Sequence, residues 1–150
     1  MFALRDYRPE DFDELWRIDQ SCFEPGIAYT RFELMAYIRS RSAFTLVAET
    51  KDLRIAGFVV AQRRSNGSGH IITIDVREAF RRSGLGSTLL GRAEAMLAER
   101  GSRGVVLETA VSNVSALTFY KRHGYEVVKT IPRYYKDSVD ALVMVKKLPL

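Results

Sequence analysis

An apolar run followed by a glycine-containing loop and a helical pattern constrains the fold of this chain more than any other feature. Residues 70–76 read HIITIDV and residues 80–87 read FRRSGLGS, after which leucine and alanine recur at helical spacing until Gly101. A second apolar run, VVLETA at 105–110, follows this helical pattern. Two strands joined through a helix need a crossover connection. The sequence therefore predicts a parallel pair of strands with a helix between them.

Further strands and helices are predicted on both sides of this unit. One helix is expected to end near residue 22, a second begins at a Thr30/Glu33 capping box, and a fourth follows Asn113. The other strands are predicted at 2–7, 43–50, 55–62, 125–131 and 141–148. The order β-α-α-β-β-β-α-β-α-β-β predicts one domain over residues 1–150, of the α/β (α+β) class. Its sheet is expected to be mixed, mostly antiparallel and of about seven strands, with four helices on its faces.

Composition argues against several classes of site and location. Cys22 is the single cysteine, so a disulfide within the chain is impossible and a cysteine-based metal site is not expected. The first residues are charged too early for a signal peptide, and no apolar run approaches the ~20 residues that span a bilayer. We expect a cytoplasmic protein with no membrane partner and no metal. The net charge of +5 suits an anionic ligand, but without a basic stripe or binding motif no nucleic acid is expected.

The glycine loop, residues 80–87, has the chemistry of a diphosphate site. Backbone N–H groups at a helix start have no partner within the helix and carry partial positive charge. Gly84 and Gly86 leave these groups uncovered, and Arg81 and Arg82 add charge that suits phosphate. The lysine of a Walker loop and the third glycine of a dinucleotide fingerprint are both missing. A flexible connector with two solvated arginines is the alternative interpretation.

The spacing R-x-x-G-x-G after this strand resembles the coenzyme loop of GNAT-type N-acetyltransferases, and the predicted element order is similar to that fold from end to end. The resemblance implies acetyl-CoA as co-substrate, with its diphosphate at the glycine loop. It also implies that the preceding strand offers backbone groups to the pantetheine arm. The residues carried over by position are Ile74, Asp75, Val76, Arg81, Arg82, Ser83, Gly84, Leu85, Gly86 and Ser87.

Glu108 and Tyr120 are candidates for acid–base chemistry on an amine and a thioester. Glu108 lies on a predicted strand next to the proposed coenzyme site. Its burial there is predicted to raise its pKa toward neutrality, which suits a base. Tyr120 lies on the helix that Asn113 is expected to cap, and a neutral phenol can donate a proton to a leaving thiolate. The alternatives are a salt-bridged Glu108, a core aromatic at Tyr120 and a plain cap at Asn113. His70 has no evident partner in the sequence.

The segment 107–128 is similar to bacterial ribosomal-protein alanine N-acetyltransferases and to the catalytic subunits of eukaryotic N-terminal acetyltransferases. The shared pattern is L-E-x-x-x-S-N, then A-L-x-x-Y, then G-Y. The resemblance implies Glu108 as general base, Asn113 as a coenzyme ligand and Tyr120 as general acid. It implies transfer of an acetyl group to the N-terminal α-amine of a peptide or protein, with a ribosomal protein as one candidate.

Two further segments resemble the acceptor slot of the same group. PRYYKDSVDALVM at 132–144 is similar to a hairpin whose tyrosines line that slot, which implies Tyr134 and Tyr135. The loop at 22–29 occupies the place of the other wall, with P-G-I where those relatives have P-W-S, and Tyr29 is expected to replace the missing bulk. Ordinary hairpin aromatics are the alternative for the tyrosine pair.

Other activities remain open at this point. Acetylation of a lysine side chain or of a small-molecule amine would use the same coenzyme site. A non-catalytic acyl-CoA-binding sensor would need the glycine loop but neither Glu108 nor Tyr120. A monomer or weak homodimer is expected.

Overall fold

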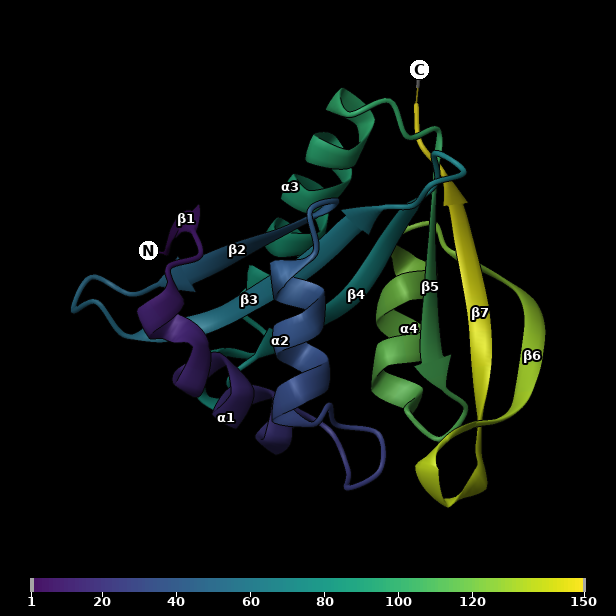
Figure 1. Ribbon diagram of the computed structural model, residues 1–150, viewed down its shortest axis with the longest axis horizontal. Coiled ribbons are helices and arrows are strands. Elements are labelled where there is room, and N and C mark those ends of the chain that lie inside the picture. Colours follow the sequence, from purple (N-terminus) through teal and green to yellow (C-terminus); the bar gives the residue numbers. More distant parts are fainter. Residues whose placement is uncertain (1, 150) are drawn as a thin grey trace.

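The computed structural model describes residues 2–149 (Figure 1). Within these residues the chain forms seven strands in one sheet and four α-helices, in the order predicted from the sequence. The strands are β1 (Ala3–Asp6), β2 (Ala43–Glu49), β3 (Ile55–Arg63), β4 (Gly69–Val76), β5 (Gly104–Ala110), β6 (Glu126–Tyr135) and β7 (Val139–Lys147). The helices are α1 (Phe12–Cys22), α2 (Arg31–Arg39), α3 (Leu85–Glu99) and α4 (Val114–Arg122). The predicted mixed, mostly antiparallel α/β fold is confirmed.

The sheet opens in its middle, between β4 and β5. The strand order is β1-β2-β3-β4-β5-β7-β6, and β4–β5 is the one parallel pair among the described strands. This pair holds only at Gly69–Val105 and His70–Val106. Figure 1 shows the two strands beginning side by side and then diverging. We call the gap between residues 71–76 and 107–110 the opening.

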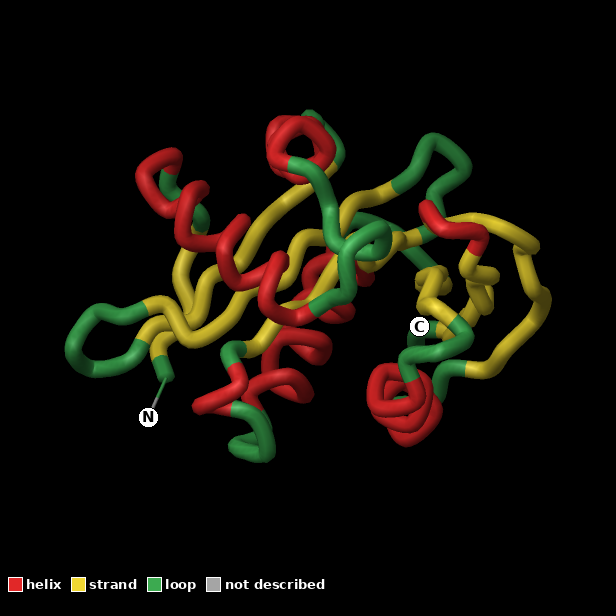
Figure 2. Tube along the Cα trace, turned by 90° about the horizontal axis from the view of Figure 1, so that it is seen from below, coloured by secondary structure: helices red, strands yellow, loops and turns green. Residues whose placement is uncertain are grey.

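Helices cover both faces of the sheet and define two cores (Figure 2). Leucines of α3 pack with residues of α4 and with one face of the strands, and the side chains of Leu15 and Ile18 in α1 pack on the other face. In β3, Val59 faces the first core and Phe58 the second. Because β3 is buried on both faces, its sequence reads as a continuous apolar run rather than an alternating one.

A β-bulge lies in β4 next to the opening. Val60 pairs with Thr73 and Ala61 with Ile71, so Ile72 is an extra residue on β4. Beyond the bulge, Ile74 packs against the α3 core. Bulges change the direction of side chains and of unpaired backbone groups. Here the bulge places the side chains of Thr73 and Asp75 on the face of the sheet that α1 covers.

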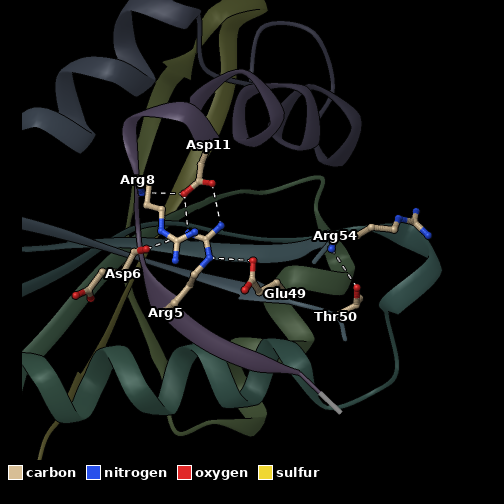
Figure 3. A network of polar contacts seen from close by, with 7 residues as sticks. All are labelled: Arg5, Asp6, Arg8, Asp11, Glu49, Thr50 and Arg54. Carbon is tan, nitrogen blue, oxygen red and sulfur yellow. Dashed lines mark hydrogen bonds and ion pairs between the residues drawn. The ribbon is translucent and has the colours of Figure 1, made fainter. Parts of the chain in front are cut away.

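Arg5 anchors the segment that leads into α1 (Figure 3). Its guanidinium donates to both carboxylate oxygens of Asp11, at 2.8 and 2.9 Å, and to Glu49 of β2 at 2.9 Å. Asp11 also accepts from the Arg8 amide at 2.8 Å. Bidentate arginine–carboxylate contacts are among the stronger polar interactions. They hold the start of α1 on β1 and β2, so α1 has a defined direction toward the opening.

The C-terminal strands are longer than the sequence indicated. β6 continues through Pro132 to Tyr135, whereas the prediction ended at residue 131. Proline lacks a backbone donor, so it is tolerated on an edge strand, and β6 is the edge of this sheet. The pairing with β7 is irregular between Ile131 and Tyr135. No helix in the described range is long and apolar enough to cross a membrane.

Gly57 and Gly91 provide a matched test of this packing. A Cβ at Gly57 would lie 2.5 Å from the carbonyl oxygen of Asp75, whereas nothing lies within 4 Å of one at Gly91 in α3. We expect Gly57→Ala to lower the free energy of unfolding by about 1–3 kcal/mol through overpacking. Gly91→Ala should raise it by about 0.5–1 kcal/mol, since alanine favours helix. Urea unfolding of both variants tests this. Equal effects would contradict the close β3–β4 contact.

Candidate active site

A cavity of about 850 Å³ lies between β4 and β5. It is also lined by the α1–α2 loop, the glycine loop, the start of α4 and the β6–β7 hairpin. The candidate residues that line it are Tyr29, Ile74, Val76, Arg81, Arg82, Gly84, Gly86, Ser87, Glu108, Asn113, Tyr120, Tyr134 and Tyr135. The side chains of Ser83, Leu85 and Asp75 do not line it. The structure therefore brings most of the predicted residues to one place.

The glycine loop presents free backbone donors to this cavity. Gly84 has a positive φ of 84° and precedes the first residue of α3. Because the first helical bond runs from the Thr88 N–H to the Gly84 carbonyl, the N–H groups of residues 85–87 have no acceptor within the helix. Leu85 is buried and anchors the first turn of α3. These donors and the helix dipole favour an anion.

The polar side chains around the glycine loop are partly engaged with the protein. Arg81 donates to the Val76 carbonyl at 3.1 Å, and its guanidinium is 3.5 Å from the Cys22 sulfur. His123 donates from Nδ1 to the Phe119 carbonyl at 2.8 Å, because a carbonyl can only accept. Its other ring nitrogen is 2.9 Å from the Ser87 hydroxyl. Arg81 therefore ties the loop to the end of β4.

Asn113 has the plain capping role that the sequence left open. Its Oδ1 accepts from the Ala116 amide at 3.1 Å, and the side chain also lines the cavity. The cap uses only the carbonyl oxygen, and the amide nitrogen carries two further donors. A cap and a ligand contact are therefore compatible at this residue.

Glu108 is held by His70, a partner that the sequence did not reveal. Glu108 Oε1 lies 2.8 Å from His70 Nε2. His70 Nδ1 faces two donors, Arg64 at 3.2 Å and Gln62 at 3.4 Å. Nδ1 is therefore the acceptor, and Nε2 carries the proton that is donated to Glu108. Arg64 also lies 3.6 Å from Glu108 Oε2, so Glu108 forms a salt bridge, which is compatible with a role as base.

The expectation that Glu108 has a raised pKa is wrong. Burial acts to raise it, but the His70 hydrogen bond and the Arg64 charge outweigh burial, so the pKa of Glu108 lies below its usual value. The sequence carried one signal for this arrangement. In the parallel pair, which ends at His70, residue 108 lies only two positions beyond the strand partner of His70, Val106. Without the register of β4 and β5, that proximity could not be derived.

Tyr120 reaches the cavity from the face of the sheet opposite to Glu108. It is buried among residues of the α3 core, as is Leu107. Because strand side chains alternate between faces, Glu108 points to the α1–α2 side instead. Burial raises the pKa of Tyr120, so its phenol stays protonated. The opening lets a carboxylate and a phenol from opposite faces meet one cavity.

Four tyrosines form what we call the tyrosine slot on the Glu108 side: Tyr29, Tyr37, Tyr134 and Tyr135. Tyr29 and Tyr37 contact edge to face at a centroid distance of 5.4 Å, and Tyr134 and Tyr135 at 4.9 Å. Burial, then the charge of Glu108, raises the pKa of both Tyr37 and Tyr134. The two walls therefore converge on Glu108. Tyr37 was missed in the sequence, although it follows Glu33 by about one turn of α2.

Comparisons with known proteins agree with this geometry. Residues 11–125 match the model of the acetyltransferase (GNAT) family. The chain is 33% identical to an uncharacterized N-acetyltransferase of Methanocaldococcus jannaschii, over 97% of this chain and 92% of that protein. It is 29% identical to an N-alpha-acetyltransferase of Sulfurisphaera tokodaii, over 98% and 93%. Its fold resembles that of Ard1 from Thermoplasma volcanium, with a TM-score of 0.88, 28% identity and 99% of each chain covered.

The polar environment of Glu108 can be tested by titration. We expect His70→Ala to raise the pKa of Glu108, because burial then acts without the donated hydrogen bond. Arg64→Gln should shift the pKa in the same direction. The Glu108 carboxyl carbon can be followed by ¹³C NMR. His123→Ala, which removes a histidine bonded elsewhere, is the control and should leave this pKa unchanged. An unchanged pKa in His70→Ala would contradict the assigned hydrogen bond.

Proposed function

Since the chain belongs to the GNAT family of acetyltransferases, which use acetyl-CoA, we propose that it acetylates the free α-amine of a peptide or protein N-terminus. The observation that carries this proposal is the tyrosine slot, which leads to Glu108 on the side opposite Tyr120. A slot walled by aromatic rings suits a single extended chain end. Relatives named N-alpha-acetyltransferases support the same acceptor.

The coenzyme site is proposed at the glycine loop and the free edge of β4. The β4–β5 ladder ends at His70, so the edge of β4 that faces the opening can bond an amide-containing arm. The residues proposed to hold the coenzyme are the backbone of Ile74–Val76, residues 81–87 and Asn113. The N–H groups of residues 85–87 would bind the diphosphate, and exposed Arg82 would add charge.

Glu108 is proposed as the base. Its lowered pKa keeps it ionised at neutral pH, so it attracts the incoming ammonium group. Acetyl-CoA supplies the acetyl thioester. The ammonium group first releases one proton to solvent, and the neutral amine nitrogen then attacks the carbonyl carbon of the thioester. The nitrogen becomes more acidic as the C–N bond forms, and the carboxylate accepts its proton directly or through one water. His70, which donates to Glu108, keeps the carboxylate oriented.

Tyr120 is proposed as the acid. The C–S bond breaks as the amide forms, and the leaving sulfur needs a proton. Burial keeps the Tyr120 phenol protonated and excludes water from its surroundings. The hydroxyl can therefore donate to the sulfur from the α4 side, while Glu108 acts from the α2 side.

A peptide with a free N-terminus and an internal lysine tests the proposal. Mass spectrometry should find the acetyl group on the α-amine, and blocking that amine should abolish transfer. Modification of the lysine would favour the side-chain alternative, and coenzyme binding without any transfer would favour a sensor.

Glu108→Gln should lower kcat by about 10²–10⁴ while acetyl-CoA binding persists. Exposed Glu99→Gln is the matched control, and wild-type turnover in Glu108→Gln would remove the base role.

Tyr120→Phe tests the acid. The ring packing remains, so we expect little change in stability but a fall in kcat of about 10². Tyr125→Phe is the matched control, because its ring contacts Tyr120 and its hydroxyl donates to Glu94 at 2.8 Å. That variant should lose about 1 kcal/mol of stability and keep its kcat. Stopped assays and thermal unfolding separate the two. A wild-type kcat in Tyr120→Phe would assign the proton to water.

Other features stay predictions from the sequence. They are a single catalytic domain over residues 1–150, a cytoplasmic location, a monomer or weak homodimer, and a ribosomal protein as one candidate acceptor.

A further inference from the structure

Two buried aspartates lie on α1 and β4, which pack against each other. Asp19 is 0% exposed and Asp75 is 1% exposed. Asp19 Oδ2 accepts from the Tyr29 amide at 2.9 Å, and Asp75 Oδ1 accepts from the Thr73 hydroxyl at 2.5 Å. Asp19 Oδ1 and Asp75 Oδ2 are buried, and no donor among the described residues bonds to either oxygen. Each carboxyl group acts directly on the protonation of the other, and a single proton between the two unpartnered oxygens would satisfy both.

The two unpartnered carboxyl oxygens require one proton between them. An ionised carboxylate can only accept hydrogen bonds, so a bond between two carboxyl groups needs one of them to be protonated. Two adjacent buried carboxylates are not both ionised, because burial and mutual repulsion oppose the second charge. Burial raises the pKa of both groups in this structure. Asp19 and Asp75 therefore form an acid–carboxylate pair.

The pair connects the tyrosine slot to β4. Through its amide, Tyr29 is bonded to Asp19, and its hydroxyl donates to the Ile72 carbonyl at 3.2 Å. The Tyr29 carbonyl accepts from Trp16 at 3.2 Å and Gln20 at 2.7 Å. Tyr29 is thus held through its amide, carbonyl and hydroxyl groups. Its ring lines the cavity, whereas neither aspartate does.

We propose that a proton shared between Asp19 and Asp75 fastens the Tyr29 wall of the tyrosine slot to β4, which makes both aspartates positioning residues for the acceptor. The proposal rests on the proposed function, since the slot must receive the acceptor. The ionisable groups that act on the pair are Cys22 from α1, Tyr29 from the loop and Tyr120 from α4. A thiol and a phenol cannot carry a positive charge, so none of these three groups can neutralise the second carboxylate. A bound proton is the remaining way to neutralise it.

Amide and alanine variants separate the proton from the carboxylate. An Asp19→Asn side chain still accepts from the Tyr29 amide, and its amide nitrogen donates to an ionised Asp75. We expect its peptide KM to remain within about twofold of the wild type. Asp19→Ala removes the acceptor of Tyr29, so the peptide KM should rise about tenfold with kcat and acetyl-CoA affinity unchanged. A rise in Asp19→Asn as large as in Asp19→Ala would overturn the shared proton.

Amide hydrogen exchange tests the positioning role without any activity. The Tyr29 amide should exchange slowly in the wild type and Asp19→Asn and quickly in Asp19→Ala, since only the last lacks its acceptor. Equal exchange in all three proteins would overturn the positioning role. If the wild type fails to acetylate free N-termini, the proposed function fails, but this exchange comparison still decides whether the pair holds Tyr29.

The pH dependence of stability tests the proton itself. The pKa values of Asp19 and Asp75 are raised in the folded state. The unfolded chain releases these protons near the usual carboxyl pKa of about 4, whereas the folded chain retains one of them. The free energy of unfolding therefore falls as pH rises from the unfolded-state carboxyl pKa through the folded-state pKa, because only the folded chain still holds the proton. Tm should fall less steeply with pH in Asp19→Asn than in the wild type, and the exposed Asp6→Asn control should keep the wild-type slope. Equal slopes in the wild type and Asp19→Asn would overturn the proposal.

Discussion

The short parallel ladder between β4 and β5 is the constraint on which the rest of the site depends. Two residue pairs hold the strands together at one end, and past His70 they separate. A sheet that stays paired buries its backbone donors and acceptors in its own ladder. A sheet that opens leaves them to a ligand. The opening also gives the helices on both faces access to one cavity, so Tyr120 and Glu108 approach from opposite sides.

Carboxylates in this structure acquire opposite properties from their surroundings. Glu108 has an imidazole N–H donor and an arginine beside it, so its charged form is favoured even though it is largely buried. Asp75 has another carboxyl group and a hydroxyl beside it, so burial dominates and the neutral form is favoured. The difference lies in the partners as well as in the depth of burial, which is greater at Asp75. The environment of Glu108 suits a group that accepts a proton during catalysis. The environment of Asp75 suits a group that keeps its proton and has a structural role.

The tyrosine slot depends on contacts remote from it. The Arg5–Asp11–Glu49 contacts hold the start of α1 on the sheet, and α1 in turn supplies Trp16, Asp19 and Gln20 to Tyr29. Without these bonds the α1–α2 loop, with Gly26 at a positive φ, would have few restraints. The bulge at Ile72 completes the arrangement, because the carbonyl of this extra residue accepts from the Tyr29 hydroxyl.

Local patterns in the sequence were sufficient for the elements, their order and the parallel crossover, because periodicity, caps and glycines act over a few residues. The glycine loop could be recognised by its chemistry, and family resemblance indicated Glu108, Tyr120 and the tyrosines. The tertiary structure alone decided that β4 and β5 diverge after two pairs, that His70 binds Glu108 and lowers its pKa, and that Asp19 meets Asp75. These contacts join residues 38 and 56 positions apart, and strand register and helix packing over the whole fold determine such distances.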